Sequence, residues 1–256
     1  MNAWWRFRGA ILAGFGAGQP RRKNERRVQM NDLSGVRACI FDAYGTLFDF
    51  ASAAAACEAA PTDRRAALTA LWRDKQLQYT WLRSLQGRYV DFWTVTGEAL
   101  DYALDSLGLA DLGLRDSLMA LYRRLSAFPE VPATLRALRS AGYATAILSN
   151  GTPDMLADAV AGAELDGLLD AILSVDALRV FKTDPRVYQY ALDRLGLAKS
   201  EVAFLSSNGW DAYAASDFGL RVVWCNRYRQ PRERLPGAPD FEIRSLAELP
   251  PLLGVD

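Results

Sequence analysis

The second half of the chain alternates short apolar runs with helical patterns, and this alternation limits the possible folds more than any other feature. Five runs end in polar or glycine-containing turns, at residues 36–41, 143–148, 171–175, 202–205 and 221–225. Runs of this length are typical of buried strands. Helical patterns separate the later runs, at residues 133–141, 154–163, 185–195 and 211–218. This order predicts a parallel sheet with right-handed crossovers, an edge strand at 241–243 and a closing helix at 246–253.

One long helical segment interrupts the alternation after the first strand. Helical patterns occupy residues 64–85, 92–107 and 114–125, with glycine turns near Gly108 and Gly113. A connection of this length needs structure of its own. We therefore predict an α/β fold with a Rossmann-like parallel sheet core, formed by residues 36–47 and 131–256, and an inserted helical cap domain at 48–130.

The first 35 residues differ from the rest in charge. They carry seven Arg or Lys and two Asp or Glu, a net charge of +5. The apolar stretch at 9–18 is much shorter than the ~20 residues that span a bilayer, and no clear cleavage motif follows it. We interpret residues 1–35 as a disordered basic leader, or as translation begun upstream of a natural start at Met30. A secretory signal is the alternative, and no membrane association is expected.

The composition excludes several function classes. The chain has no His, which rules out Ser-His-Asp and Cys-His catalysis and His-ligated zinc. Lys plus Arg is 30 and Asp plus Glu is 30, and a neutral chain is not expected to bind nucleic acid. The three cysteines are far apart, which is typical of reduced thiols in a cytoplasmic protein.

Polar residues follow several predicted strands. Asp42 follows the first run, Ser149 and Asn150 the second, Lys182 comes shortly after the third, and 206–211 follow the fourth. Because the carboxyl ends of parallel strands meet at one edge of a sheet, these side chains are expected to converge there. A carboxylate shielded from water in such a cleft can act as a covalent nucleophile, although one such Asp alone is more often a turn cap.

Together, these segments resemble the haloacid dehalogenase-like superfamily, and within it the L-2-haloacid dehalogenases. The resemblance covers residues 36–250 and is carried by six blocks, at 41–49, 71–77, 79–85, 148–151, 184–188 and 206–211. It implies hydrolytic dehalogenation of short (S)-2-haloalkanoic acids to (R)-2-hydroxy acids through a covalent aspartyl ester. It implies no metal and no organic cofactor, and a homodimer joined partly through cap helices.

The resemblance also implies roles for individual residues. Asp42 is the expected nucleophile, Arg73 accepts the halide, and Lys182 keeps Asp42 ionised. The remaining expected catalytic residues support these three: Thr46, Ser206, Asn208 and Asp211. The expected substrate contacts are Ala43, Tyr44, Arg73, Leu77, Phe92, Ser149, Asn150, Tyr188 and Trp210. The chain departs from the family pattern at Asp74, where a neutral amide is expected, and at Thr183, where proline usually follows the lysine.

A magnesium-dependent phosphatase of the same superfamily is the alternative enzyme. Such phosphatases carry a second Asp two residues after the nucleophile, where this chain has Tyr44. A phenol with a pKa near 10 is a poor replacement for that acid. Halide leaves as an anion and needs no proton, so Tyr44 favours dehalogenation. A binding or scaffold protein on the same fold is the non-enzymatic alternative.

Overall fold

The computed structural model of the chain describes residues 33–255. Most of the predicted leader, residues 1–32, lies outside the described residues. Leu33 is buried and packs in the same apolar core as Val36. The apolar core of the described chain therefore begins before the first predicted strand.

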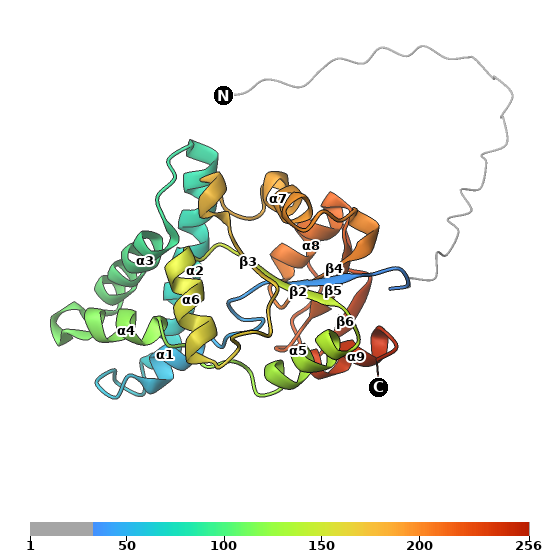
Figure 1. The fold of residues 1–256 in the computed structure, drawn as a ribbon. Helices are drawn as coiled ribbons and strands as arrows, with labels where there is room; N and C mark the ends of the chain where they lie inside the picture. The colour runs from blue at the N-terminus through green and yellow to red at the C-terminus, as the bar shows by residue number, and fades with distance from the viewer. Residues whose placement is uncertain (1–32, 256) are drawn as a thin grey trace, which may run out of the picture. The chain divides into compact units, whose positions relative to one another are not determined.

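Six parallel strands form a sheet in the order β3-β2-β1-β4-β5-β6 (Figure 1). The strands are β1 (Ala38–Phe41), β2 (Ala144–Ser149), β3 (Ala171–Ser174), β4 (Val202–Ser206), β5 (Arg221–Cys225) and β6 (Phe241–Ile243). Phe41 at the end of the inner strand β1 pairs with Ile147 on one side and with Leu205 on the other. The residues that follow β1, β2 and β4 are therefore neighbours at one edge of the sheet.

Helices cover both faces of this sheet. They are α5 (Val131–Ser140), α6 (Pro153–Gly162), α7 (Pro185–Leu195), α8 (Gly209–Phe218) and α9 (Leu249–Leu252). Figure 1 shows α7 and α8 on one side of the sheet, and α5 and α9 on the other. Two-sided burial explains why the strands are apolar at successive positions instead of alternating with polar residues. Short 3-10 helices complete the connections, at Ala110–Leu112, Val175–Leu178, Lys199–Glu201 and Leu246–Glu248.

Four helices lie between β1 and α5 in the sequence. They are α1 (Ala51–Ala56), α2 (Arg65–Gln86), α3 (Phe92–Leu107) and α4 (Leu114–Tyr122), and Figure 1 shows them gathered to one side of the sheet. Gly87 ends α2 in the left-handed conformation, with φ of +63°, which suits a residue without a Cβ. The Asp91 side chain then caps α3 by accepting from the Thr94 N–H. The domain boundaries at residues 48 and 130 stay a prediction.

The predicted Rossmann-like parallel α/β fold is confirmed. The bounds predicted for the helices at 92–107 and 185–195 and for the strand at 241–243 agree with the structure. Helix α1 was not predicted, because five of its six residues are alanine and give no contrast between apolar and polar positions. The helix predicted at 114–125 ends earlier, at Tyr122. Among the described residues, no helix has both the length and the apolar character that crossing a bilayer requires.

Candidate active site

The sheet places Asp42 at its carboxyl edge. The Asp42 backbone N–H continues the β1–β4 ladder by donating to the Leu205 carbonyl oxygen over 2.8 Å. The chain then turns at once, because the Ala43 carbonyl accepts from the N–H groups of Leu47 and Phe48. This turn places Thr46 next to the Asp42 side chain.

Asp42 is 5% exposed, and both oxygens of its carboxylate have donors. Lys182 Nζ donates to Oδ1 over 2.9 Å. Oδ2 accepts from Thr46 Oγ1 over 3.0 Å and from Asn208 Nδ2 over 2.8 Å. Three donors around one buried carboxylate hold it in a fixed orientation.

Lys182 bridges two carboxylates in the interior of the protein. Its side chain is 1% exposed, and Nζ also donates to Asp211 Oδ2 over 2.8 Å. Burial opposes the charge on Lys182, but the carboxylates of Asp211 and Asp42 outweigh it and raise the lysine pKa above its usual value. The lysine therefore stays a cation between the two acids.

Asp211 is completely buried at the start of α8. Burial raises the pKa of Asp211, although the Lys182 charge acts against this and the Asp42 charge acts with it. Tyr188 donates its hydroxyl to Asp211 Oδ1 over 2.8 Å. Burial and the Asp211 charge raise the pKa of Tyr188 well above its usual value, so this phenol remains a neutral donor.

Arg73 reaches the same cluster from helix α2. Its Nη2 donates to Asn208 Oδ1 over 3.2 Å, and its guanidinium lies 5.1 Å from the centre of the Phe50 ring. Asn208 therefore connects Arg73 to Asp42 through the two ends of one amide. Asp74, the acidic departure from the family pattern, is exposed to solvent on the same helix.

The predicted residues at the end of β2 are buried beside Lys182. Asn150 Oδ1 accepts from the Lys182 backbone N–H over 3.0 Å, and Ser149 Oγ accepts from the Gly151 N–H over 3.1 Å. The Asn150 contact ties the end of β2 to the segment that carries the lysine, and the Ser149 contact fixes the turn after β2. The peptide bond between Lys182 and Thr183 is cis.

Ser206 joins the network through the backbone of Asn208 and makes no direct hydrogen bond to Asp42. Its hydroxyl oxygen accepts from the Asn208 backbone N–H over 3.1 Å, and it donates to the Asn208 carbonyl oxygen over 3.4 Å. The Ser207 N–H donates to Thr46 Oγ1 over 2.8 Å. The loop after β4 is therefore tied to the turn after β1, which fixes Asn208 against Asp42.

Aromatic rings enclose the charged groups. The Tyr44 ring centre lies 5.9 Å from that of Phe92 and 5.5 Å from that of Tyr122, and burial raises the pKa of Tyr44 well above its usual value. Trp210 packs edge-on against Trp81, with ring centres 5.6 Å apart. Tyr44 is close enough to Asp42 for the carboxylate charge to act on it, so this ring and its neighbour Phe92 supply a surface of low polarity near the carboxylate.

The structure brings most of the predicted residues together, but not all of them. Hydrogen bonds connect eight side chains directly or through one neighbour: Asp42, Thr46, Arg73, Lys182, Tyr188, Ser206, Asn208 and Asp211. Leu77 is partly exposed on α2, and its apolar side chain cannot take part in hydrogen bonds. Ala43 takes part through its backbone only.

Three further residues border the site, and the sequence analysis did not single them out. Gln76 accepts from Arg73 Nη1 over 2.7 Å, Tyr122 contacts Gln76, and Phe50 lies under the guanidinium. The spacing of three residues from Arg73 was an available signal for Gln76, because residues i and i+3 share a helix face. No local signal points to Tyr122 or Phe50, which lie on other elements.

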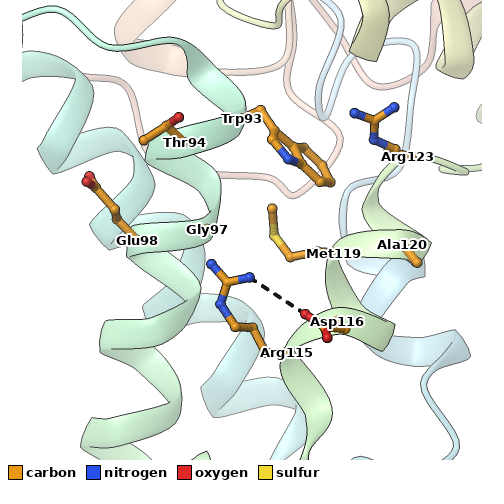
Figure 2. A pocket seen from close by; sticks show the side chains of 9 residues that line it. All are labelled: Trp93, Thr94, Gly97, Glu98, Arg115, Asp116, Met119, Ala120 and Arg123. Atoms are coloured by element: carbon orange, nitrogen blue, oxygen red, sulfur yellow. Dashed lines mark ion pairs between the residues drawn. The ribbon is translucent and has the colours of Figure 1, made fainter.

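A cavity of about 550 Å³ lies between α3 and α4 (Figure 2). The residues that line it are Trp93, Thr94, Gly97, Glu98, Arg115, Asp116, Met119, Ala120 and Arg123. Arg115 pairs with Asp116 across 3.7 Å and more closely with Asp101. None of the predicted site residues lines this cavity, so the Asp42 cluster is the better candidate for an active site.

Among residues 33–255, no group of three or more His, Cys, Asp or Glu side chains is arranged to hold a metal ion. The two acids of the cluster, Asp42 and Asp211, both pair with Lys182. The charge that balances these acids is therefore supplied by a side chain.

A parallel sheet with a buried polar cluster at its carboxyl edge defines the class as an α/β enzyme. A family model described as haloacid dehalogenase-like hydrolase matches residues 36–219. The chain belongs to this family.

Relatives of this chain include (S)-2-haloacid dehalogenase 4A of Burkholderia cepacia, which is 47% identical over 86% of this chain and 96% of its own length. The structure of L-2-haloacid dehalogenase from Xanthobacter autotrophicus with chloropropionic acid covalently bound is 41% identical, with a TM-score of 0.78 over 86% of this chain and 98% of that one. A crystal structure of a dehalogenase is 46% identical, with a TM-score of 0.84 over 87% of this chain and 99% of that one.

Proposed function

We propose that the protein hydrolyses short (S)-2-haloalkanoic acids to (R)-2-hydroxy acids through an ester on Asp42, without a metal ion. The observation that carries this proposal is the set of contacts around the buried Asp42 carboxylate. Lys182 holds one oxygen and Asn208 the other, and Asn208 also binds the Arg73 guanidinium. The (S)-2-haloacid dehalogenases among the relatives, one with chloropropionic acid covalently bound, support the same reaction.

In the first step, an Asp42 carboxylate oxygen attacks the carbon that bears the halogen, from the opposite side. A carbon–oxygen bond forms, the carbon–halogen bond breaks, and the halide leaves with the bonding electrons, which inverts the carbon. Arg73 receives the halide, because a guanidinium is weakly hydrated and permanently charged. The rings of Tyr44 and Phe92 keep water away from the Asp42 carboxylate, which increases the reactivity of this nucleophile.

In the second step, water attacks the carboxyl carbon of Asp42 in the ester. Asp211 accepts a proton from this water, a role that its raised pKa favours. The ester bond between the carboxyl carbon and the substrate oxygen then breaks, and the departing oxygen takes up the proton. Lys182, together with Asn208 and Thr46, stabilises the negative charge that develops on the carboxyl oxygens.

The end of β2 supplies donors for the substrate carboxylate. Both side chains are buried, and each uses its oxygen as an acceptor, from the Gly151 N–H and the Lys182 N–H, respectively. The Ser149 hydroxyl hydrogen and the Asn150 Nδ2 group are therefore the donors that these residues could offer to a carboxylate. The remaining expected substrate contacts are Ala43, Leu77, Tyr188 and Trp210.

A magnesium-dependent phosphatase is not favoured. Its second acid would stand at position 44, where this chain has a buried tyrosine. A hard divalent cation needs several oxygen ligands, but both acids of the cluster are already paired with Lys182. The donor set therefore fits a reaction whose leaving group needs no proton.

We propose that residues 48–130 act as a cap that closes over the site. Three contacts between this segment and the core support the proposal. Arg73 donates to Asn208, the Tyr89 hydroxyl donates to Asp176 Oδ1 over 2.6 Å, and Trp81 packs on Trp210. A cap held by such contacts keeps bulk water from the ester until the second step.

We further propose a cytoplasmic homodimer. Cys39, Cys57 and Cys225 are all free and buried, which suits a reducing compartment. Leu82 and Leu85 on α2 expose 50% and 85% of their surface, respectively, and offer an apolar contact for a second copy.

The decisive experiment follows the oxygen of water through one turnover. Enzyme in excess over (S)-2-chloropropionate reacts in water enriched in the heavy oxygen isotope, and the peptide containing Asp42 is then analysed by mass spectrometry. Because water attacks the Asp42 carboxyl carbon, we expect the heavy oxygen in that peptide and ordinary oxygen in the released hydroxy acid. Heavy oxygen in the hydroxy acid alone would contradict the covalent mechanism.

Two controls test whether Asp42 is the nucleophile and whether the reaction needs a metal ion. Asp42→Asn is expected to lower halide release by at least about 10⁴-fold, since an amide cannot replace the nucleophile. Halide release in the presence of EDTA is expected to match that in its absence. A loss of activity in EDTA that magnesium restores would instead favour the phosphatase class.

A further inference from the structure

A buried glutamine lies one helical turn after the halide-accepting arginine. Gln76 is 1% exposed, and its Oε1 accepts from Arg73 Nη1 over 2.7 Å. Burying a primary amide is costly unless its oxygen and both amide hydrogens have partners. The partners of Gln76 therefore show what holds the amide in place.

The other end of the Gln76 amide is held by two further helices of the insertion. Its Nε2 donates to Thr96 Oγ1 on α3 over 2.7 Å and to the Tyr122 hydroxyl oxygen on α4 over 3.1 Å. Three helices thus meet at one side chain. Together with the hydrogen bond from Arg73, these contacts give partners to the oxygen and to both amide hydrogens of Gln76.

The hydrogen bonds of Thr96 determine which way the amide faces. Thr96 Oγ1 donates its only hydrogen to the Phe92 carbonyl oxygen over 2.7 Å, so towards Gln76 it can only accept. The Trp72 indole N–H fixes the same turn of α3 by donating to the Thr96 carbonyl oxygen over 2.8 Å. Gln76 must therefore present Nε2 to Thr96 and its oxygen to Arg73.

This arrangement orients Arg73 without neutralising it. Among the described residues, the hydrogen-bond partners of the guanidinium are Gln76 Oε1 and Asn208 Oδ1, two amide oxygens without net charge. No ion pair joins Arg73 to an acid in the described part of the chain. A carboxylate in place of Gln76 would hold the guanidinium equally well, but it would cancel the charge that attracts a halide.

We propose that Gln76 is a positioning residue that fixes the Arg73 guanidinium for the departing halide. The inference rests on the proposed function and adds a determinant of leaving-group preference. Chloride is a poorer leaving group than bromide, so its departure depends more on the stabilisation that Arg73 provides. Misplacing the guanidinium should therefore slow the chloro substrate more than the bromo substrate.

The test compares halide release from (S)-2-chloropropionate and (S)-2-bromopropionate in a single turnover. Each rate is divided by the concentration of folded enzyme. In Gln76→Met we expect chloride release to fall by about 10- to 100-fold, the range for losing one hydrogen bond to a charged group. Bromide release should fall less, so that the ratio of bromide to chloride rates rises at least about threefold. In Gln76→Glu both rates should fall further, because the new acid pairs with Arg73.

A matched control lies on the same helix. Gln78 is exposed, and within residues 33–255 its side chain accepts only from Lys75 Nζ, so Gln78→Met should leave both rates and their ratio unchanged. If Gln76→Met destabilises the fold, Thr96→Val removes the acceptor of Gln76 Nε2 from a different helix and should shift the ratio in the same direction.

The outcomes are distinguishable. A ratio that stays constant in both Gln76→Met and Thr96→Val, whatever the loss in rate, would show a structural role only and overturn the inference. If the unaltered enzyme released halide from neither substrate, the proposed function itself would fail.

Discussion

The charged residues of the site are stabilised by neighbouring groups of opposite charge, because they are shielded from solvent. Lys182 is the clearest case, since it stays charged in the interior only because Asp42 and Asp211 flank it. Breaking a buried pair by removing one partner typically costs about 3–5 kcal/mol of stability, because the other charge is left uncompensated. The proposed catalytic cluster is therefore also a structural unit.

The raised pKa of Lys182 predicts how activity depends on pH. The folded state holds the lysine proton more tightly than the unfolded state, so the stabilisation is present below the usual lysine value of 10.5 and is lost as pH rises through the higher folded value. Halide release should accordingly stay level up to the pKa of Lys182 in the folded state, which lies above 10.5, and fall at higher pH. A pH profile of the turnover rate, measured between about pH 8 and pH 12, checks this.

Buried tyrosines such as Tyr188 also make the protein less stable at high pH. Their hydroxyl groups ionise at a lower pH in the unfolded state than in the folded state. The assignment to lysine therefore needs Lys182→Arg, whose cation has a higher pKa. If this variant retains measurable activity, its alkaline limb should move to higher pH. An identical limb in both proteins would assign the fall to another group.

Helix α2 combines two functions along its length. One face carries Arg73 and Gln76 toward the site, and Leu82 and Leu85 near its end face solvent. An amphipathic helix normally buries its large apolar side chains. The exposed leucines Leu82 and Leu85 are therefore the contact that we propose for the second copy.

The exposed end of α2 gives a prediction about assembly. Leu85→Arg should weaken the proposed homodimer by about 10- to 100-fold, since burying a leucine contributes roughly 1.5–3 kcal/mol. Sedimentation velocity over a concentration series measures the shift. Leu252→Arg on α9, where the leucine is 37% exposed, is the control and should leave the dimer intact. An unaltered protein that sediments as a monomer throughout would contradict the assembly.

At the scale of the whole molecule, the core and the site lie within residues 33–255. The family model begins at residue 36, and the Burkholderia cepacia relative is matched over 96% of its length by 86% of this chain. From both observations we expect that the proposed activity does not need residues 1–30.

Two truncations test this. Removal of residues 1–30 should leave the turnover rate and the melting temperature unchanged. Removal of residues 1–35 also deletes Leu33, which is 4% exposed, and should cost roughly 2–5 kcal/mol, the range for losing a buried leucine. Thermal unfolding and halide release measured on both proteins check the contrast. A large loss of activity in the shorter truncation would give the leader a function.

The sequence by itself determined the strands, most helices and the residues that follow each strand. These features are local: the apolar runs, the helical periods and the glycine stops act within a few residues of one another. Asp42, Lys182 and Asp211 were predictable for the same reason, because each lies shortly after an apolar run. Their roles came from the family resemblance.

The tertiary structure alone decided how these residues pair. Lys182 bridges acids that lie 140 and 29 positions away, and Gln76 meets Thr96 and Tyr122 from separate helices. Such contacts depend on how whole elements pack, and no local pattern encodes them. The spacing of three residues from Arg73 could have pointed to Gln76 itself. Its partners Thr96 and Tyr122 become visible only when three helices come together.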